Sequence, residues 1–282
     1  MQVFCTDILG SKGSSPAKDL FSAQSKEYAS SRPTYPRTLF EFIVGLVDEK
    51  TLAWDCATGN GQAALVLADY FKEVIASDIS ARQLENAQQK SNIRYQIFSA
   101  ENTPLKDNSV DLITIAQALH WFDFDRFYSE ARRVLRKRKD GKTGEGGGGI
   151  IAAWAYGLHT ISPEVDKVTH QLYEDILGDK YWPPERKYVE ERYETIPFPF
   201  EQIPSPEFQI QLSWNLSELV NYYRSWSSVQ KFIEKNKYDP ISEVSGSLEY
   251  GWGGKNKVDE KRKVVWPLYV KIGKIWDASA VN

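Results

Sequence analysis

Several features of secreted, metal-binding or membrane proteins are scarce or missing in this sequence of 282 residues. Its two cysteines, Cys5 and Cys56, are too few for a disulfide framework or a four-cysteine zinc site, which favours a reducing intracellular location. His, Cys and carboxylate residues do not occur at metal-ligand spacings, so we expect no metal. There is no run of about 18 apolar residues, and residues 1–10 do not read as a signal peptide. We therefore expect a cytoplasmic protein that contacts no membrane.

An excess of charge of one sign is also missing. The chain has 35 Lys and Arg against 38 Asp and Glu, a formal net charge of −3 at pH 7. A dedicated nucleic-acid binder would carry a basic excess, so we expect no nucleic-acid partner. The hydrophobic fraction of 41% is typical of a globular protein. The chain is long enough to bury a large core by itself, so we expect a monomer or a homodimer.

Alternating apolar runs and helical periodicity indicate the fold class. Between residues 51 and 154 the pattern is that of a parallel sheet covered on both faces, in an α/β fold. A helix is predicted after Pro36, before the first strand. Towards the C-terminus, two strand-like segments flank a helix near residues 217–236 and are expected to pair antiparallel at the sheet edge. The predicted strands are residues 51–54, 74–78, 93–98, 112–116, 150–154, 208–212 and 264–275.

The chain after the fifth strand changes in composition. Residues 158–205 are rich in aromatic residues and proline, with one clear helix at 163–177, and we interpret them as a helical lid. His159 and His170 lie in this segment and are expected at its surface. The glycine-rich residues 139–149 are expected to form a mobile loop. The predicted organisation is a disordered tail (1–18), a ligand-binding core (19–157), the lid (158–205) and the remainder of the core (206–282).

The turn after the first strand is the most informative motif. It reads Asp55-x-Ala57-x-Gly59-x-Gly61, in which Gly59 permits a tight turn and Gly61 lets a ligand approach the backbone. The glycines, with Asp78 as a ribose-binding acid, also fit a dinucleotide fingerprint, so a nicotinamide-dependent oxidoreductase is one alternative and a mere connecting turn is another. Asp55 favours a different ligand. Its carboxylate would repel a pyrophosphate but attract the ammonium and sulfonium groups of S-adenosylmethionine.

This motif is followed, in order, by Asp78 after the second strand and by residues 99–101, 108–113 and 133–136. The set resembles the motifs of the class I S-adenosylmethionine-dependent methyltransferases over about residues 20–154. The resemblance implies a Rossmann-like fold, with a seven-stranded, mostly parallel sheet that has an antiparallel edge strand. It implies S-adenosylmethionine as the cofactor, bound by Asp55, Ala57, Gly59, Gly61, Asp78, Ile79, Ala100, Glu101, Gln117 and Ala118.

Two further segments suggest a subgroup. Residues 21–36 and 117–122 resemble the trans-aconitate methyltransferase-like group and its plant relatives. Several members of that group are cytosolic enzymes that form methyl esters of small carboxylic acids. The resemblance therefore implies a small-molecule acceptor, and an aromatic-rich lid suits such an acceptor.

The acceptor determines which catalytic groups are needed. A carboxylate is ionised at neutral pH and needs no general base, whereas a phenol or an alcohol does. His120, after the fourth strand, is expected to be a base or to orient the acceptor, with a structural histidine as the alternative. Arg32 is expected to bind a carboxylate in the acceptor site, with Arg186 as a second contact from the lid. Contact of Arg32 with the donor and a solvated arginine at a helix entry are the alternatives. The acceptor site is expected to be lined by Tyr28, Tyr35, Trp121, Trp154 and Tyr156, and core packing is the competing explanation for the tryptophans.

The sequence thus predicts an S-adenosylmethionine-dependent methyltransferase whose acceptor is a small molecule, with a carboxylic acid preferred. Two alternatives are a non-catalytic protein that binds S-adenosylmethionine and a methyltransferase that acts on a macromolecule.

Overall fold

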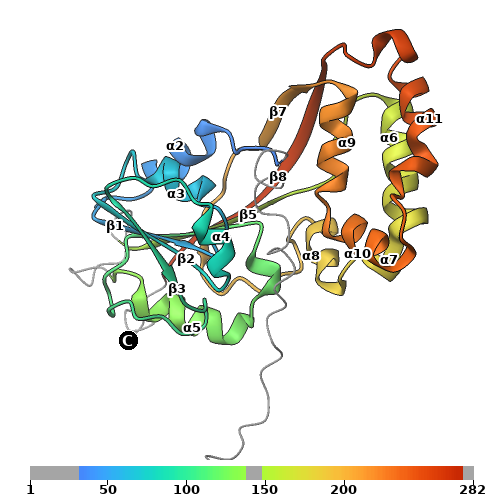
Figure 1. The fold of residues 1–282 in the computed structure, drawn as a ribbon. Helices are drawn as coiled ribbons and strands as arrows, with labels where there is room; N and C mark the ends of the chain where they lie inside the picture. Colours follow the sequence, from blue (N-terminus) through green and yellow to red (C-terminus); the bar gives the residue numbers. More distant parts are fainter. Residues whose placement is uncertain (1–31, 138–147, 276–282) are drawn as a thin grey trace, which may run out of the picture.

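The computed structural model describes residues 32–137 and 148–275, and Figure 1 shows its fold. The predicted tail, Tyr28 and most of the predicted loop 139–149 lie outside the described residues. Five parallel strands form the centre of the sheet in the order β3-β2-β1-β4-β5, and all five strand predictions are confirmed. They are β1 (Leu52–Cys56), β2 (Glu73–Asp78), β3 (Ile93–Ile97), β4 (Leu112–Ala116) and β5 (Ile150–Tyr156).

The other side of the sheet is antiparallel, as predicted. The long strand β8 (Arg262–Lys274) pairs with β5 through residues 268–274 and with β7 (Phe208–Trp214) through residues 262–268. The described sheet has eight strands, whereas seven were predicted, because the two-residue β6 (Glu201–Gln202) pairs with the end of β8. A Cβ at Gly273 would lie only 2.7 Å from the Cβ of Phe200, so the missing side chain lets this segment approach β8.

Helices cover both faces of the sheet. The helices α2 (Arg37–Gly45) and α3 (Gln62–Leu67) pack with β-strand residues such as Ala53 in one core cluster. The helix α5 (Phe124–Val134) packs on the opposite face with Trp54 and its neighbours. Alternate residues of β1 therefore enter different cores, as expected of a strand buried on both faces. The short helix α4 (Ala81–Glu85) follows β2, and the 3₁₀ turn η2 (Leu119–Trp121) follows β4.

The remaining helices form a second group beside β8 (Figure 1). The helix α11 packs on α6 and α10 packs on α7, so segments before and after β7 build this group together. The helix predicted at 163–177 is confirmed, although its second half is a π-helix. The single helix predicted near 217–236 is two helices in the structure. The helix α11 was not predicted from the sequence. From the predicted lid come α6 (Pro163–His170), η3 (Gln171–Leu177), α7 (Gly178–Tyr181), η4 (Pro184–Arg186) and α8 (Lys187–Glu190). Later in the chain come α9 (Leu216–Arg224), α10 (Ser227–Asn236), α11 (Ile241–Gly251) and η5 (Lys255–Lys257).

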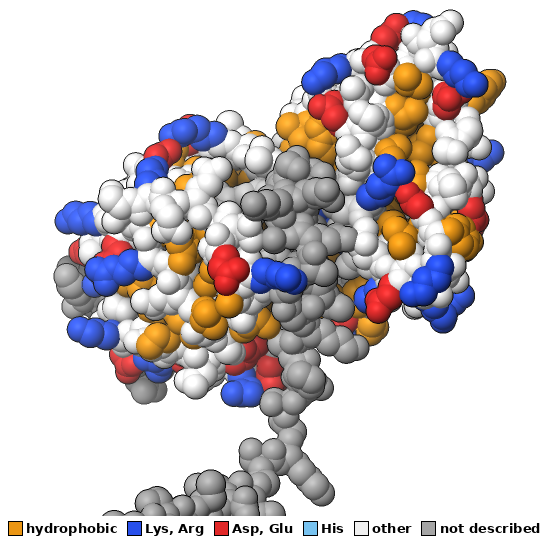
Figure 2. All heavy atoms as spheres, in the orientation of Figure 1, with side chains coloured by type: hydrophobic (Ala, Val, Ile, Leu, Met, Phe, Trp, Pro, Cys, Tyr) orange, Lys and Arg blue, Asp and Glu red, His pale blue; other side chains and the backbone are white. Residues whose placement is uncertain are grey.

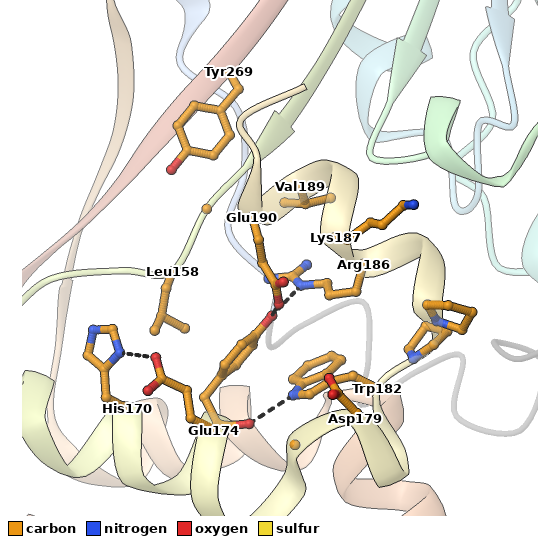
Figure 3. Close-up of a pocket in the computed structure, with 15 residues that line it drawn as sticks. Leu158, His170, Glu174, Asp179, Trp182, Arg186, Lys187, Val189, Glu190 and Tyr269 are labelled. Atoms are coloured by element: carbon orange, nitrogen blue, oxygen red, sulfur yellow. Dashed lines mark hydrogen bonds and ion pairs between the residues drawn. The ribbon is translucent and has the colours of Figure 1, made fainter. Parts of the chain in front are cut away.

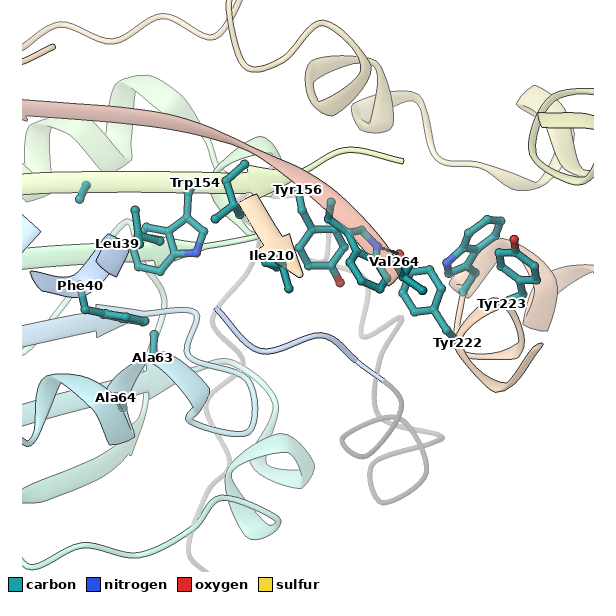
Figure 4. Close-up of a cluster of buried hydrophobic side chains, with 14 of the residues drawn as sticks. Leu39, Phe40, Ala63, Ala64, Trp154, Tyr156, Ile210, Tyr222, Tyr223 and Val264 are labelled. Carbon is teal, nitrogen blue, oxygen red and sulfur yellow. Dashed lines mark hydrogen bonds between the residues drawn. The ribbon is translucent and has the colours of Figure 1, made fainter. Parts of the chain in front are cut away.

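One apolar core joins the sheet to this helical group. Figure 4 shows buried side chains that run from Leu39 and Phe40 on α2, past Trp154 on β5, to Tyr222 and Tyr223 on α9. The helical group is therefore packed on the core through side chains and is not attached by a linker alone. None of the helices in residues 32–137 and 148–275 combines the length and apolar character that a membrane span requires.

Candidate active site

The residues predicted from the motifs gather at the carboxyl edge of four neighbouring strands. Cys56 is in register with Ser77 of β2 and with Ile115 of β4, so these strands end at the same level. Asp78 ends β2, Gln117 follows β4 and residues 99–101 follow β3. Open α/β sheets bind their ligands at this edge.

The turn after β1 is fixed to β2 by two hydrogen bonds. The backbone N–H of Thr58 donates to the carbonyl of Ser77 at 2.8 Å, and the N–H of Gly59 donates to Oδ2 of Asp78 at 2.9 Å. Ala57, Gly59 and Gly61 all adopt positive φ, with 57° at Gly59. A Cβ added at Gly59 would meet no atom within 4 Å, so the turn has open space in front of it for a ligand.

Gly61 has a packing function that the sequence did not indicate. A Cβ at this position would lie 2.4 Å from Oη of Tyr95, and that hydroxyl donates to the carbonyl of Gln88 at 2.8 Å. Gly61 also has a φ of 85°, which an L side chain rarely adopts. In this structure Gly61 makes room for the side chain of Tyr95 from β3, and its predicted contact with the cofactor stays a prediction.

Asp55 forms hydrogen bonds with the turn after β1, with α3 and with β4. Its side chain is only 1% exposed and accepts hydrogen bonds from Oγ1 of Thr58, from Oγ1 of Thr114 at 2.7 Å and from the N–H of Ala64 at 3.1 Å. Burial raises the pKa of Asp55 to about 6, although these bonds favour the ionised form. The motif predicted the acid but not Thr114, for which the only signal was one hydroxyl in an otherwise apolar strand.

Asp78 and Ile79 place a polar and an apolar side chain next to each other at the end of β2. The Asp78 carboxylate is half-buried and accepts from the N–H of Ser80 at 2.9 Å, besides its bond to Gly59. Ile79 is 49% exposed, which is unusual for a large apolar side chain directly after a buried strand. A carboxylate beside an exposed apolar side chain suits the two hydroxyls of a ribose and the ring of a base.

The predicted residues after β3 and β4 take different positions. Glu101 accepts from Oγ of Ser99 and from the N–H of Asp123 at 3.3 Å, so it joins this turn to the start of α5. The side chains of Ala100 and Ala118 are buried in the core beneath α5. They contribute to packing.

Gln117 provides a test of whether the edge fits a donor that carries an amino-acid group. Its φ is 60°, and its side-chain Nε2 is buried without a hydrogen-bond partner among the described residues. An unpaired buried donor costs about 1–3 kcal/mol, so this amide is expected to meet an acceptor group on a ligand. A carboxylate is such a group. The open turn, the carboxylate of Asp78 and this amide together fit S-adenosylmethionine.

His120 lies in η2, at the boundary between the sheet and the lid. It is 6% exposed, and its Nδ1 lies 2.8 Å from Oη of Tyr193. Burial, and then the charge of Arg186, lower the pKa of His120 to about 3. Such a weak base is a poor proton acceptor, and this low pKa favours the orienting role over the role of a general base. Trp121 packs beside it, with ring centroids 4.9 Å apart.

A cavity of about 790 Å³ lies between the helices of residues 163–190, the chain directly after β5 and the middle of β8 (Figure 3). Its walls include the aromatic residues Tyr173, Trp182 and Tyr269, and charged residues such as Arg186 and Glu190. None of the residues predicted to bind the donor lines it, but Arg186, predicted as an acceptor contact, does. The turn η4 that carries Arg186 packs against η2, which carries His120, although His120 itself does not line the cavity.

Arg186 is held in place by neutral partners. Its Nε donates to Oη of Tyr173 at 2.7 Å, and that hydroxyl donates to Glu190 at 2.6 Å. The guanidinium also lies over the ring of Trp182, 5.1 Å from its centroid. Figure 3 shows this arrangement at the cavity wall. Within the described part of the chain Nη1 and Nη2 make no hydrogen bond or ion pair, which leaves two donors for a ligand.

Arg32 is engaged by protein groups. Its Nη1 donates to Oη of Tyr156 at 3.1 Å and its Nη2 donates to the carbonyl of Ser225 at 2.8 Å. The guanidinium therefore joins the end of β5 to the end of α9. Its predicted contact with the acceptor stays a prediction, and so does that of Tyr156, whose hydroxyl is used in this bond.

Trp154 and Tyr35 contribute to the core. Trp154 is fully buried and packs edge-on against Tyr35 and Phe40, with centroids 5.4 and 5.7 Å apart. Core packing, the competing explanation from the sequence, accounts for the ring of Trp154. Its Nε1 is buried without a hydrogen-bond partner among the described residues, and its predicted contact with the acceptor stays a prediction. Neither residue lines the cavity.

The prediction for His159 was wrong and that for His170 is confirmed. His159 is 2% exposed, because the chain after β5 runs along β8, where Thr160 bridges to Val265. Its Nε2 lies 3.1 Å from Oη of Tyr223, and burial lowers the pKa of His159 to about 3. His170 is exposed and bonds Glu174 at 2.7 Å. Within the described ranges, no group of three or more His, Cys, Asp or Glu side chains is placed to hold a metal ion.

Comparisons with known proteins agree with this geometry. Residues 54–140 match the family model of the methyltransferase domain. A Dictyostelium discoideum protein described as a "putative methyltransferase" is 36% identical over 259 residues, which are 91% of this chain and 95% of that protein. A solved structure from Anaeromyxobacter dehalogenans, described as a "putative type II methyltransferase", is 37% identical with a TM-score of 0.76, covering 86% of this chain and 97% of the other. The matches span both the donor motifs and the helical group, and the chain therefore belongs to the class I S-adenosylmethionine-dependent methyltransferases.

Proposed function

We propose that this methyltransferase transfers the methyl group of S-adenosylmethionine to the carboxylate of a small organic acid held in the cavity of Figure 3. The observation that carries the proposal is Arg186, which lines the cavity and whose Nη1 and Nη2 make no hydrogen bond or ion pair within the described residues. Its turn η4 packs against η2, which carries His120. A guanidinium fork matches a carboxylate in both geometry and charge.

The donor is proposed to lie along the carboxyl edge of β2, β1 and β4. Asp78 would accept from the ribose hydroxyls, Ile79 would contact the adenine, and Gln117 would donate to the methionine carboxylate. The carboxylate of Asp55, buried behind the turn, would favour the positive charge of the donor. The backbone of Ala57 and Gly59 would face the ligand, with Glu101 near the adenine. S-adenosylmethionine supplies an activated methyl group, so the protein has to align the two reactants and exclude water.

The acceptor side favours a group that is already ionised. A carboxylate is deprotonated at neutral pH, and no base is required for its methylation. This agrees with a histidine whose pKa is lowered to about 3. The aromatic residues Tyr173, Trp182 and Tyr269 would pack against the rest of the acid. The methyl ester would therefore form between a donor at the sheet edge and an acid in the lid cavity.

A macromolecular acceptor has less support. On the face shown in Figure 2, basic and acidic side chains are interspersed and are not gathered by sign, and the net charge is −3. The membership of the trans-aconitate-like subgroup, the cytoplasmic location and the monomeric or homodimeric state stay predictions of this proposal.

The proposal is tested by supplying labelled S-adenosylmethionine with a panel of small mono-, di- and tricarboxylic acids, phenols and thiols. We expect label in methyl esters and release of S-adenosylhomocysteine with acids only. Label in phenols or thiols but not in acids would contradict the proposed acceptor, while binding of the donor without transfer to any acceptor would contradict the proposed reaction.

The role of Arg186 gives a sharper prediction. We expect Arg186→Gln to raise KM for the acid about 10- to 100-fold, because a charged hydrogen-bond pair is lost, while the affinity for S-adenosylmethionine stays the same. Arg224→Gln is the matched control, since Arg224 lies on the surface of α9 in an ion pair with Asp239. Initial rates at varied acid concentration and calorimetric titration with the donor separate the two effects. An unchanged KM in Arg186→Gln would refute the assignment of the carboxylate anchor.

A further inference from the structure

Tyr193 holds His120 from the lid side in an unusual backbone conformation. It is fully buried, follows α8, and its Oη lies 2.8 Å from Nδ1 of His120. Arg192 and Tyr193 have φ values of 55° and 62°, two consecutive residues in the left-handed region without a glycine. Each such residue costs about 1 kcal/mol or more, and such strain concentrates at functional sites.

The position of the proton between these residues follows from the available acceptors. Among the described residues Oη of Tyr193 has one hydrogen-bond partner, Nδ1 of His120, so one acceptor is available for its proton. A buried hydroxyl proton is rarely left unpaired. Tyr193 therefore donates to Nδ1. Because a neutral imidazole carries one proton, that proton lies on Nε2.

The other ring nitrogen is available for a ligand. Nε2 of His120 has no hydrogen bond with any described residue, and the cavity-lining Arg186 is close enough for its charge to act on the ring. In this tautomer Nε2 carries a hydrogen and no free lone pair. It can donate a hydrogen bond, but it cannot accept a proton from an acceptor molecule.

We infer that Tyr193 is a positioning residue that fixes His120 as the Nε2–H tautomer, so that the site accepts substrates that are already deprotonated and discriminates against those that must lose a proton. The inference rests on the proposed transfer to an acceptor held beside His120. Carboxylates satisfy this condition at neutral pH, whereas phenols and alcohols do not. Because Tyr193 comes from the lid and His120 from the core, docking of the lid sets the tautomer.

A matched pair of variants tests this. Tyr193→Phe and Tyr223→Phe each remove one hydroxyl from a fully buried tyrosine that bonds a buried histidine. The chain contains three histidines, so long-range ¹H–¹⁵N spectra of the ¹⁵N-histidine-labelled protein resolve each tautomer. We expect His120 to carry its proton on Nε2 in the wild type and a mixture of tautomers in Tyr193→Phe, with the wild-type pattern at His120 in Tyr223→Phe.

Kinetics separate positioning from a loss of stability. We expect Tyr193→Phe to lower kcat for a carboxylic acid about tenfold, with KM and the donor affinity within twofold, because the acceptor is held less accurately. We expect Tyr193→Phe and Tyr223→Phe to lower the melting temperature by similar amounts, because each loses one buried hydroxyl. Tyr223→Phe is expected to leave kcat unchanged. A wild-type proton on Nδ1, or an unchanged His120 spectrum and kcat in Tyr193→Phe, would overturn the inference. Failure of the wild type to methylate any acid would overturn the proposed function, and the spectra report the tautomer in either case.

Discussion

Asp78→Ala is expected to raise the Kd for S-adenosylmethionine about 100-fold. Each oxygen of the Asp78 carboxylate accepts one backbone hydrogen bond: Oδ2 from the N–H of Gly59 and Oδ1 from the N–H of Ser80, both at 2.9 Å. It therefore fixes the turn after β1 and, in our proposal, also binds the ribose hydroxyls. Hydrogen bonds to a charged group contribute about 1.5–3 kcal/mol each, so loss of these contacts corresponds to about two orders of magnitude in affinity.

Two control variants make this result specific. Asp69→Ala is the same substitution at an exposed carboxylate that pairs with Lys90 and Arg37, and we expect donor affinity within twofold of the wild type. His120→Ala removes a residue assigned to the acceptor, so it should leave the Kd for the donor nearly unchanged. Calorimetric titration gives all three values. Donor binding by Asp78→Ala with wild-type affinity would refute the placement of the donor over β2.

The residues proposed to bind the donor lie in short motifs, which is why the sequence could place them at one edge of the sheet. Asp55, Gly59 and Gly61 lie within seven consecutive residues, and parallel strands bring Asp78 and Gln117 to the same edge through their alternating pattern. What the motif did not show is how its members are used. Gly61 accommodates Tyr95 from another strand, and Asp55 accepts hydrogen bonds from two threonines. The motif could not show these contacts, because they depend largely on side chains elsewhere in the sequence.

The acceptor side depends on contacts that are distant in sequence and could not be predicted in the same way. Tyr193 meets His120 across 73 residues, and Arg32 meets Ser225 across 193. No local periodicity specifies such pairs. The same limit explains His159, which looked like a surface residue until the path of β8 placed it against Tyr223. Arg186 lines the cavity, its predicted contact with the acceptor stays a prediction, and its aromatic support was found only in the structure.

Mild acid is expected to destabilise the protein through its two buried histidines. The pKa values of His120 and His159 are lowered from 6.5 to about 3, mainly by burial. A lowered folded-state pKa means that the unfolded chain binds a proton that the folded protein does not, so stability is lost as pH falls below 6.5. Each group costs about 1.4 kcal/mol per pH unit, which gives about 4 kcal/mol for both at pH 5.

Asp55 acts in the opposite direction but does not cancel this loss. Its pKa is raised from 3.8 to about 6, so the folded protein takes up a proton first and gains stability as pH falls from 6 to 3.8. At pH 5 the gain is about 1.4 kcal/mol. The histidines prevail because there are two of them and because their effect begins at higher pH. We therefore expect a net loss of about 3 kcal/mol between pH 7.5 and pH 5, measured by urea denaturation in buffers of constant ionic strength.

His159→Gln identifies the groups responsible. The variant should be less stable than the wild type at pH 7.5, because it loses the bond to Tyr223 and the packing against Trp266. Its free energy of unfolding should nevertheless fall less steeply below pH 6.5, since His120 is then the one buried histidine that takes up a proton on unfolding. The stability of the variant and that of the wild type should therefore converge towards pH 5. His170→Gln, at an exposed histidine of the same lid, should run parallel to the wild type. If His159→Gln also ran parallel, the acid lability would have to come from groups other than the buried histidines.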